Sequence, residues 1–110
     1  MIDPGKLEQI LLNLTANAVR HIPADTGLVR VLPEFRAEFF IARVVDNGPG
    51  IPPSEIERIF QAFEQVVESV GGSGLGLAIS RGLAHALDGS LTVSSAVGRG
   101  SEFTLRLPIA

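Results

Sequence analysis

Residues 7–21 read LEQILLNLTANAVRH, and this segment carries two side-chain patterns at helical spacing. Asp3 can cap the helix and Pro4 can begin it, because a carboxylate accepts from free backbone amides and proline fits the first helical position. An apolar stripe follows, made of Leu7, Ile10, Leu11, Leu14 and Ala18. The pattern predicts a helix over residues 4–21 with one face packed on a core.

A polar stripe lies beside the apolar one and consists of Lys6, Gln9, Asn13, Asn17, Arg20 and His21. A solvated face explains such a stripe, since an amphipathic helix needs a polar side. However, asparagine is a mediocre helix former, and Asn13 and Asn17 bring no charge pair to an exposed face. An amide oxygen suits Mg²⁺, and Arg20 would reach nearby phosphates. The stripe is therefore either solvated or part of a magnesium–phosphate site.

Four β-rich segments predict the sheet. Residues 28–32 and 39–45 are neighbouring candidates, separated from the first helix by a proline and an Asp-Thr-Gly turn. Residues 90–95 and 102–107 flank the turn sequence Gly98-Arg99-Gly100, which predicts a hairpin.

Two further helices are expected. Ser54 and Glu57 have capping-box spacing, which predicts a short helix through Phe60. A second long helix is predicted over about residues 75–87, with Gly89 in the left-handed position that follows a helix. Phe60 and Phe63 lie three residues apart, and this spacing fits either core packing or the docking of a mobile segment.

These elements predict one domain with two layers. The chain has 110 residues, of which 45% are hydrophobic and 19% charged, so it is expected to fold around a single core. The order of elements favours an α/β (α+β) two-layer sandwich. We expect a mixed, largely antiparallel sheet with about three helices on one face, and residues 1–110 as one domain.

Composition excludes several classes of function. The net charge is −3 and no Lys/Arg cluster is present, so neither nucleic acid nor a membrane surface is an expected partner. The chain has no cysteine, which excludes disulfides and thiolate sites and agrees with a cytoplasmic location. No apolar run approaches the roughly 20 residues that span a bilayer, although a longer parent protein could still be membrane-anchored.

The loop at residues 46–51, Asp-Asn-Gly-Pro-Gly-Ile, has two interpretations. It can be a plain turn that leaves a strand. It can also be a base-binding loop, because Gly48 and Gly50 remove side chains where a flat ligand would approach. A buried Asp46 carboxylate could accept from the amine of adenine, whereas guanine would oppose it with an oxygen. Ile51 is a candidate wall beside the base, or plain core.

A second glycine cluster, Gly-Gly-Ser-Gly-Leu-Gly-Leu at residues 71–77, leads into the second long helix. Free amides and the positive end of the helix dipole could face an anion there. The cluster matches neither the dinucleotide fingerprint nor the Walker motif. Taken alone, it is weak evidence for a phosphate site.

Taken in order, these motifs resemble the catalytic domain of sensor histidine kinases, in the GHKL superfamily with gyrase-type topoisomerases, chaperone ATPases and mismatch-repair ATPases. The resemblance covers nearly the whole chain and rests on residues 7–21, the 46–51 loop, Phe-Gln-Ala-Phe at 60–63, the 71–77 cluster and Gly-Arg-Gly-Ser-Glu-Phe at 98–103. It implies an ATP- and Mg²⁺-binding domain that transfers the γ-phosphate to a histidine on a separate dimerisation and phosphotransfer domain. A response regulator would be served by the full-length protein.

The resemblance also implies roles for particular residues. Asn17 would bind Mg²⁺, Asn13 would support that site, and Arg20 and His21 would approach phosphate or ribose. Asp46 would bind the adenine amine. Backbone and wall contacts would come from Gly48, Gly50, Ile51, Gly72, Ser73, Gly74, Leu75, Gly76 and Leu77.

The departures from the family pattern matter for activity. Hydrolytic members of the superfamily place a glutamate at the position of Asn13, and asparagine cannot accept a proton from water, so phosphoryl transfer is favoured over hydrolysis. The predicted lid, residues 52–73, is short and has no cation after Arg58. The alternatives are a catalytically weak nucleotide-sensing module and, less favoured, a hydrolysing ATPase. Neither His21 nor His85 lies in a phosphoacceptor motif, and the strand expected before the first helix is missing.

Overall fold

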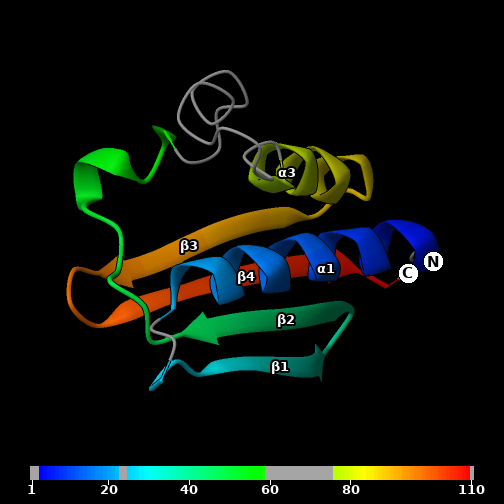
Figure 1. The fold of residues 1–110 in the computed structure, drawn as a ribbon. Helices are drawn as coiled ribbons and strands as arrows, with labels where there is room; N and C mark the ends of the chain where they lie inside the picture. Colours follow the sequence, from blue (N-terminus) through cyan, green and yellow to red (C-terminus); the bar gives the residue numbers. More distant parts are fainter. Residues whose placement is uncertain (1–2, 23–24, 59–75, 110) are drawn as a thin grey trace.

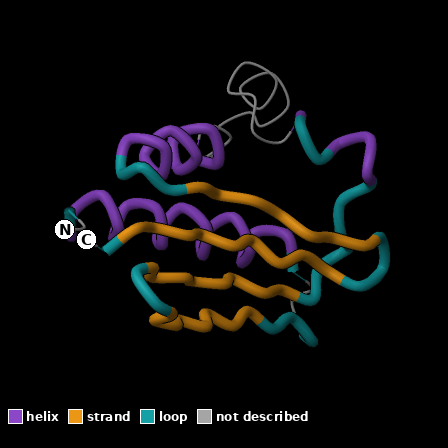
Figure 2. Tube along the Cα trace, turned by 180° about the vertical axis from the view of Figure 1, so that it is seen from behind, coloured by secondary structure: helices purple, strands orange, loops and turns teal. Residues whose placement is uncertain are grey.

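A computed structural model of the chain describes residues 3–22, 25–58 and 76–109. Its elements, in chain order, are α1 (Pro4–His21), β1 (Val29–Arg36), β2 (Phe39–Asp46), the 3-10 helix η1 (Pro53–Glu55), α3 (Gly76–Ala86), β3 (Ser90–Ala96) and β4 (Gly100–Pro108). Figure 1 shows α1 and α3 on one face of the sheet, and Figure 2 shows the strands from behind. Among these residues no helix is both long and apolar enough to cross a bilayer.

Helix α1 forms where the capping signal predicts it. The Asp3 carboxylate accepts hydrogen bonds from the amides of Gly5 and Lys6, at 2.9 and 3.2 Å, and Pro4 occupies the first helical position. The observed bounds, Pro4–His21, confirm the predicted helix.

The four-stranded sheet has the order β1-β2-β4-β3, and every pairing is antiparallel. The predicted two-layer α/β class is confirmed. In the described ranges the sheet has no parallel pairing and two α-helices cover it, against the expected mixed sheet with about three helices. The two predicted hairpin partners, β3 and β4, also pair as expected.

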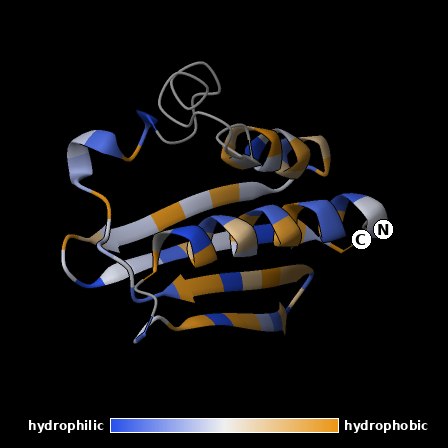
Figure 3. Cartoon of the chain, viewed as in Figure 1, coloured by the Kyte–Doolittle hydropathy of each residue, from blue (hydrophilic) through white to orange (hydrophobic). Residues whose placement is uncertain are grey.

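Cross-strand rows of apolar side chains build the core. In the register, Phe40 lies opposite Leu107, Ala42 opposite Leu105 and Val44 opposite Phe103, and all six are buried. The helices complete this core with Ile10, Leu14, Ala18, Leu77 and Ala84. Figure 3 shows the resulting alternation of apolar and polar segments along the strands. The predicted apolar stripe of α1 therefore faces the sheet.

Strand β1 is longer than predicted and continues to Arg36 through Pro33. Proline lacks an amide proton, but an edge strand tolerates it because one side needs no pairing. The Phe35 ring also lies 5.2 Å from the Phe40 ring across the hairpin. Pairing with β2 thus extends β1 through residues 33–36, whose composition is typical of a loop.

The capping-box prediction at Ser54 was wrong. Pro53–Glu55 forms a single 3-10 turn, in which the Glu55 amide donates to the Pro52 carbonyl at 2.8 Å. Ser54 therefore lies inside the turn instead of preceding a helix, because Pro53 already occupies the turn's first position. The predicted end at Phe60, like Phe63, lies outside the described residues.

The end of α3 also differs from the prediction in one respect. Asp88, with φ of 63°, adopts the left-handed conformation, and Gly89 does not. Gly89 serves close packing instead, since a side chain there would collide with the Arg106 carbonyl on β4. The glycine is thus required by the neighbouring strand and not by the helix end.

Candidate nucleotide-binding site

The last cross-strand row on the helix-covered face of the sheet is polar. Asp46 on β2 lies opposite Ser101 on β4, and Ser101 lies opposite Ser95 on β3. Asp46 and Ser101 are each only 8% exposed. The preceding row, which contains Val44 and Phe103, is buried and apolar, so the polar row marks the point where the core ends.

The Asp46 carboxylate is held by its own loop. Its Oδ1 accepts a hydrogen bond from the Gly48 amide at 2.8 Å, which forms an Asx turn. In the part of the chain that the structure describes, this is the carboxylate's one hydrogen bond, so Oδ2 keeps its capacity to accept. A buried acceptor of this kind favours a ligand that brings a donor.

The Asn47 side chain fastens one side of the loop. Its Oδ1 accepts from the Leu28 amide and its Nδ2 donates to the Thr26 carbonyl, both at 2.7 Å. The Asn47 backbone amide also donates to the Leu28 carbonyl at 3.2 Å, so the side chain adds to the backbone pairing just before β1 begins. Both polar atoms of the Asn47 side chain therefore hold the loop in place.

The β3–β4 hairpin fastens the other side of the loop. The Gly98 amide donates to the Pro49 carbonyl at 2.8 Å, and the Ile51 amide donates to Ser95 Oγ at 2.7 Å. Gly50 has φ of 81° and lies so close to β3 that a side chain would collide with the Ala96 carbonyl. The Ile51 side chain is partly buried and packs against the core, as the plain-core interpretation expects, and its role as a wall beside the base stays a prediction.

The polar stripe of α1 is internally hydrogen-bonded. Gln9 Nε2 donates to Asn13 Oδ1 at 3.0 Å, and an Arg20 guanidinium nitrogen lies 3.4 Å from Asn17 Oδ1. Asn13 and Asn17 are half-buried, while Arg20 is exposed. In Figure 1 the C-terminal end of α1 and the end of β2 lie at the same end of the molecule. Asn17, Arg20 and Asp46 thus share that end.

The second glycine cluster is described only at its last two residues. Gly76 begins α3, and the Leu77 side chain is buried in the core, so any ligand contact from Leu77 must come from its backbone. Gly72, Ser73, Gly74 and Leu75 lie outside the described residues, as does the His21 side chain and the part of the predicted lid after residue 58. Arg58, within that lid, pairs with Glu55 at 2.9 Å.

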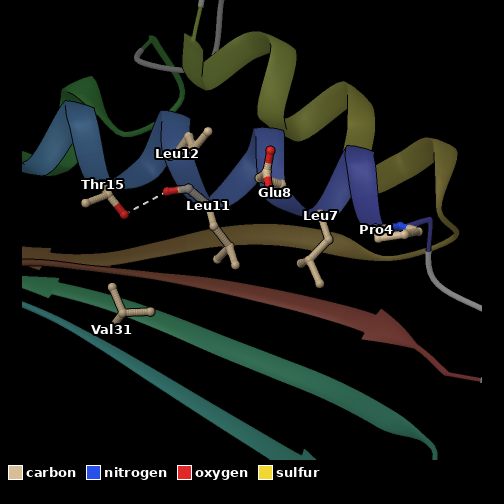
Figure 4. A pocket seen from close by; sticks show the side chains of 7 residues that line it. All are labelled: Pro4, Leu7, Glu8, Leu11, Leu12, Thr15 and Val31. Atoms are coloured by element: carbon tan, nitrogen blue, oxygen red, sulfur yellow. Dashed lines mark hydrogen bonds between the residues drawn. The ribbon is translucent and has the colours of Figure 1, made fainter.

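A separate groove lies between α1 and β1. It has a volume of about 430 Å³ and is lined by Pro4, Leu7, Glu8, Leu11, Leu12, Thr15 and Val31 (Figure 4). None of the residues predicted to bind nucleotide is among them. The groove is mostly apolar and offers no cation to a triphosphate, so it is distinct from the polar row.

Sequence reasoning gave Ser95 and Ser101 no role. Two serines six residues apart in a hairpin give no local signal, because only the β3–β4 register places them opposite each other. The Gly98-Arg99-Gly100-Ser101 motif was the sequence signal that could have pointed to this polar row. Gly100, with φ of 101°, must be glycine because a side chain there would collide with the Asp46 carbonyl.

Among the described residues no group of three or more His, Cys, Asp or Glu side chains is arranged to hold a metal ion. Asn17 Oδ1 is a hard, neutral oxygen of the kind that Mg²⁺ takes as a ligand, and the Arg20 guanidinium beside it is a cation of the kind that pairs with phosphates. Magnesium binding at Asn17 stays a prediction.

Comparison with known protein families and sequences identifies the class of this domain. Residues 2–110 match the family described as histidine kinase-, DNA gyrase B-, and HSP90-like ATPase. The chain is 40% identical over 111 residues to the sensor histidine kinase RcsC of Escherichia coli K12, covering 97% of this chain and 12% of that protein.

Solved structures show the same likeness. Full-length ShkA in complex with AMPPNP superposes with a TM-score of 0.82 at 38% identity, over 94% of this chain and 21% of that chain. The mycobacterial sensor histidine kinase MprB superposes with a TM-score of 0.83 at 31% identity, over 98% of this chain and 75% of that chain. The chain therefore belongs to the histidine kinase-, DNA gyrase B- and HSP90-like ATPase family, and its relatives there are sensor histidine kinases.

Proposed function

We propose that this domain binds Mg-ATP at the polar end of its sheet and presents the γ-phosphate to a histidine on a separate dimerisation and phosphotransfer domain. The observation that carries the proposal is the Asp46 carboxylate, which is 8% exposed and oriented by the Gly48 amide, in a member of an ATPase family. Adenine would donate its amine to Asp46, whereas guanine would place an oxygen against it.

The phosphate end of the proposed site belongs to α1 and to the start of α3. Asn17 would bind Mg²⁺, and Arg20 would turn from Asn17 to the phosphates. His21 would approach phosphate or ribose, and backbone amides of residues 72–77 would meet the anion at the helix N-terminus. When bound, the metal would neutralise phosphate charge during transfer.

Asn13 supports transfer in preference to hydrolysis. Its amide oxygen already accepts from Gln9 at 3.0 Å, and an amide cannot take a proton from water. In the proposed reaction an imidazole nitrogen of the acceptor histidine forms a bond to the γ-phosphorus. The bond from that phosphorus to the β,γ-bridging oxygen breaks, and ADP leaves. A neutral imidazole needs no strong base from this domain.

The chain spans 12% of RcsC, so the acceptor domain and the response regulator are proposed partners that come with a longer protein. The AMPPNP bound by full-length ShkA supports the nucleotide class. The lid at residues 52–73 remains a prediction. Its lack of a cation after Arg58 implies that phosphate contacts come from elsewhere, including the partner domain.

Mixing this domain with the phosphoacceptor domain of its parent protein and γ-labelled ATP tests the proposal. We expect acid-labile label on the acceptor histidine, dependent on Mg²⁺, and little free phosphate without acceptor. Asn17→Ala and Asp46→Asn should each reduce labelling at least tenfold. Asp25→Asn, an exposed loop change, is the matched control and should label normally.

Calorimetric titration with Mg-ATP separates binding from transfer. Wild-type protein that binds Mg-ATP but never labels the histidine would replace the kinase proposal with a nucleotide-sensing module. Rapid phosphate release without acceptor would favour a hydrolysing ATPase. Unchanged ATP affinity in both site variants would show that the binding site lies elsewhere.

A further inference from the structure

Ser95 joins the 46–51 loop to the β3–β4 hairpin through a single oxygen atom. Its Oγ lies 2.7 Å from the Ile51 amide nitrogen, 2.8 Å from the Gly100 carbonyl oxygen and 2.9 Å from Ser101 Oγ. The four groups come from the loop, from β3 and from the start of β4. The half-buried hydroxyl is therefore a junction between segments that are distant in the sequence.

The chemistry of a hydroxyl fixes the direction of these bonds. A serine has one proton to donate and two lone pairs that accept. The Ile51 amide can only donate and the Gly100 carbonyl can only accept, so Ser95 accepts from Ile51 and donates to Gly100. Its remaining lone pair must then accept the Ser101 proton, which gives the one arrangement that satisfies all four groups.

This arrangement directs the Ser101 proton away from Asp46. Ser101 is the direct cross-strand partner of Asp46, and both side chains are buried on the same face of the sheet. A hydroxyl that donated to Asp46 would occupy one of the carboxylate's acceptor positions and weaken the carboxylate as an acceptor for a ligand amine. With its proton held by Ser95, Ser101 leaves Asp46 Oδ2 open to the ligand.

We infer that Ser95 is a positioning residue for adenine recognition, which fixes the Ile51 end of the base-binding loop and keeps the Ser101 proton from Asp46. The inference rests on the proposed function, because it assigns Ser95 a task at that site. Ser95 touches neither the nucleotide nor the reacting atoms. It acts through Ile51 and Ser101.

Removing the hydroxyl has two effects at once. In Ser95→Ala the Ile51 amide loses its acceptor, and the Ser101 hydroxyl becomes free to turn to Asp46. The loss of one ordinary hydrogen bond corresponds to roughly a fivefold change in affinity. The loss should concern the amine contact and leave the phosphate contacts unchanged.

Equilibrium binding of ATP and of inosine triphosphate, both with Mg²⁺, tests this assignment. Inosine has an oxygen where adenine has its amine, so it cannot make the amine contact with Asp46, and its one base-edge donor beside that oxygen is the proton on ring N1. We expect Ser95→Ala to bind ATP roughly fivefold more weakly and inosine triphosphate almost as wild type does. Ser95→Thr, which keeps the hydroxyl, should restore the preference, and the exposed neighbour change Ser94→Ala should leave it intact.

A second readout needs no nucleotide. In ¹H–¹⁵N spectra the Ile51 amide proton of Ser95→Ala should move upfield and exchange faster with solvent, and Ser95→Thr should return it towards the wild-type position. An unmoved Ile51 resonance, or equal weakening of both nucleotides, would overturn the inference. Failure of the proposed function has a different signature, namely an ATP preference that survives Asp46→Asn.

Discussion

Gly50 occupies a backbone position that suits glycine for two separate reasons. Its φ of 81° lies in the left-handed region, which costs a residue with a side chain about 1 kcal/mol or more. A side-chain carbon would also meet the Ala96 carbonyl oxygen of the neighbouring strand. The loop and the hairpin can therefore approach as they do only with glycine here.

Gly50→Ala should lower the free energy of unfolding by about 2 kcal/mol or more, because backbone strain and collision with Ala96 add. The matched control is Gly82→Ala on α3, where a side chain meets nothing within 4 Å. That change should raise stability by about 0.5–1 kcal/mol, since alanine favours a helix over glycine. Urea denaturation of both variants measures the difference. Equal effects would contradict the predicted contact with β3.

Local sequence signals singled out positions that depend on one residue and its neighbours along the chain. Asp3 was recognisable as a cap from its place before Pro4. Asp46 was singled out from its place between a β-rich run and two glycines; the structure buries it at the end of β2, and its contact with adenine stays a prediction. Ser95 was not recognisable, because its hydroxyl comes opposite Ser101 only when β3 and β4 pair in this register. Asp88, with φ of 63°, was missed because the adjacent glycine gave the more familiar signal.

A cluster of charged side chains links three strands on the outer face of the sheet. Arg43 on β2 lies 2.9 Å from Glu34 on β1 and 3.8 Å from Glu102 on β4, and Arg36 adds a second contact to Glu34 at 3.1 Å. The hydrogen bond from Arg43, followed by the charge of Arg36, lowers the pKa of Glu34 below its ordinary value. These pairs help to explain why β1 continues past Pro33.

The lowered pKa of Glu34 predicts a pH dependence with a definite sign. The contribution of Glu34 to stability is fully present above the ordinary glutamate pKa of 4.5 and is lost as pH falls through the lower folded pKa. Glu34→Gln should therefore be less stable than wild type near pH 7, by a small amount because the pair is exposed, and the gap should close towards pH 3.

Denaturant midpoints recorded from pH 3 to pH 7 check this prediction. Glu38→Gln is the matched control, because Glu38 lies in the exposed turn beside β1 and has no ion pair among the described residues. If the difference in stability between Glu34→Gln and wild type stays constant with pH, ionisation of Glu34 does not contribute to folding stability.

At the element level, propensity and spacing predicted α1, β2, α3, β3 and β4 within a few residues. The failures share a physical cause. β1 extends through Pro33 because β2 offers it a partner, and Ser54 cannot cap a helix because the 3-10 turn already begins at Pro53, with Pro52 before it. In both places tertiary pairing or proline geometry overrides local propensity.

For the molecule as a whole, binding and stability should be linked. A ligand that binds only the folded state stabilises it by about 2.7 kcal/mol at a concentration one hundred times its Kd. Mg-ATP at that excess should raise the melting temperature by several degrees in a domain of this size. Asp46→Asn should lose most of this shift at the same ATP concentration, while Asp25→Asn should keep it. An equal shift in both variants would argue against Asp46 as the adenine contact.

The order of the cross-strand rows has a consequence for how this domain can change in evolution. The row that contains Val44 and Phe103 lies directly beside the row that contains Asp46 and Ser101. Any substitution that alters the strand spacing in the first row also shifts the donors and acceptors in the second. We therefore expect that repacking Val44 or Phe103 changes nucleotide affinity at the proposed site without replacing a residue that is proposed to touch the ligand.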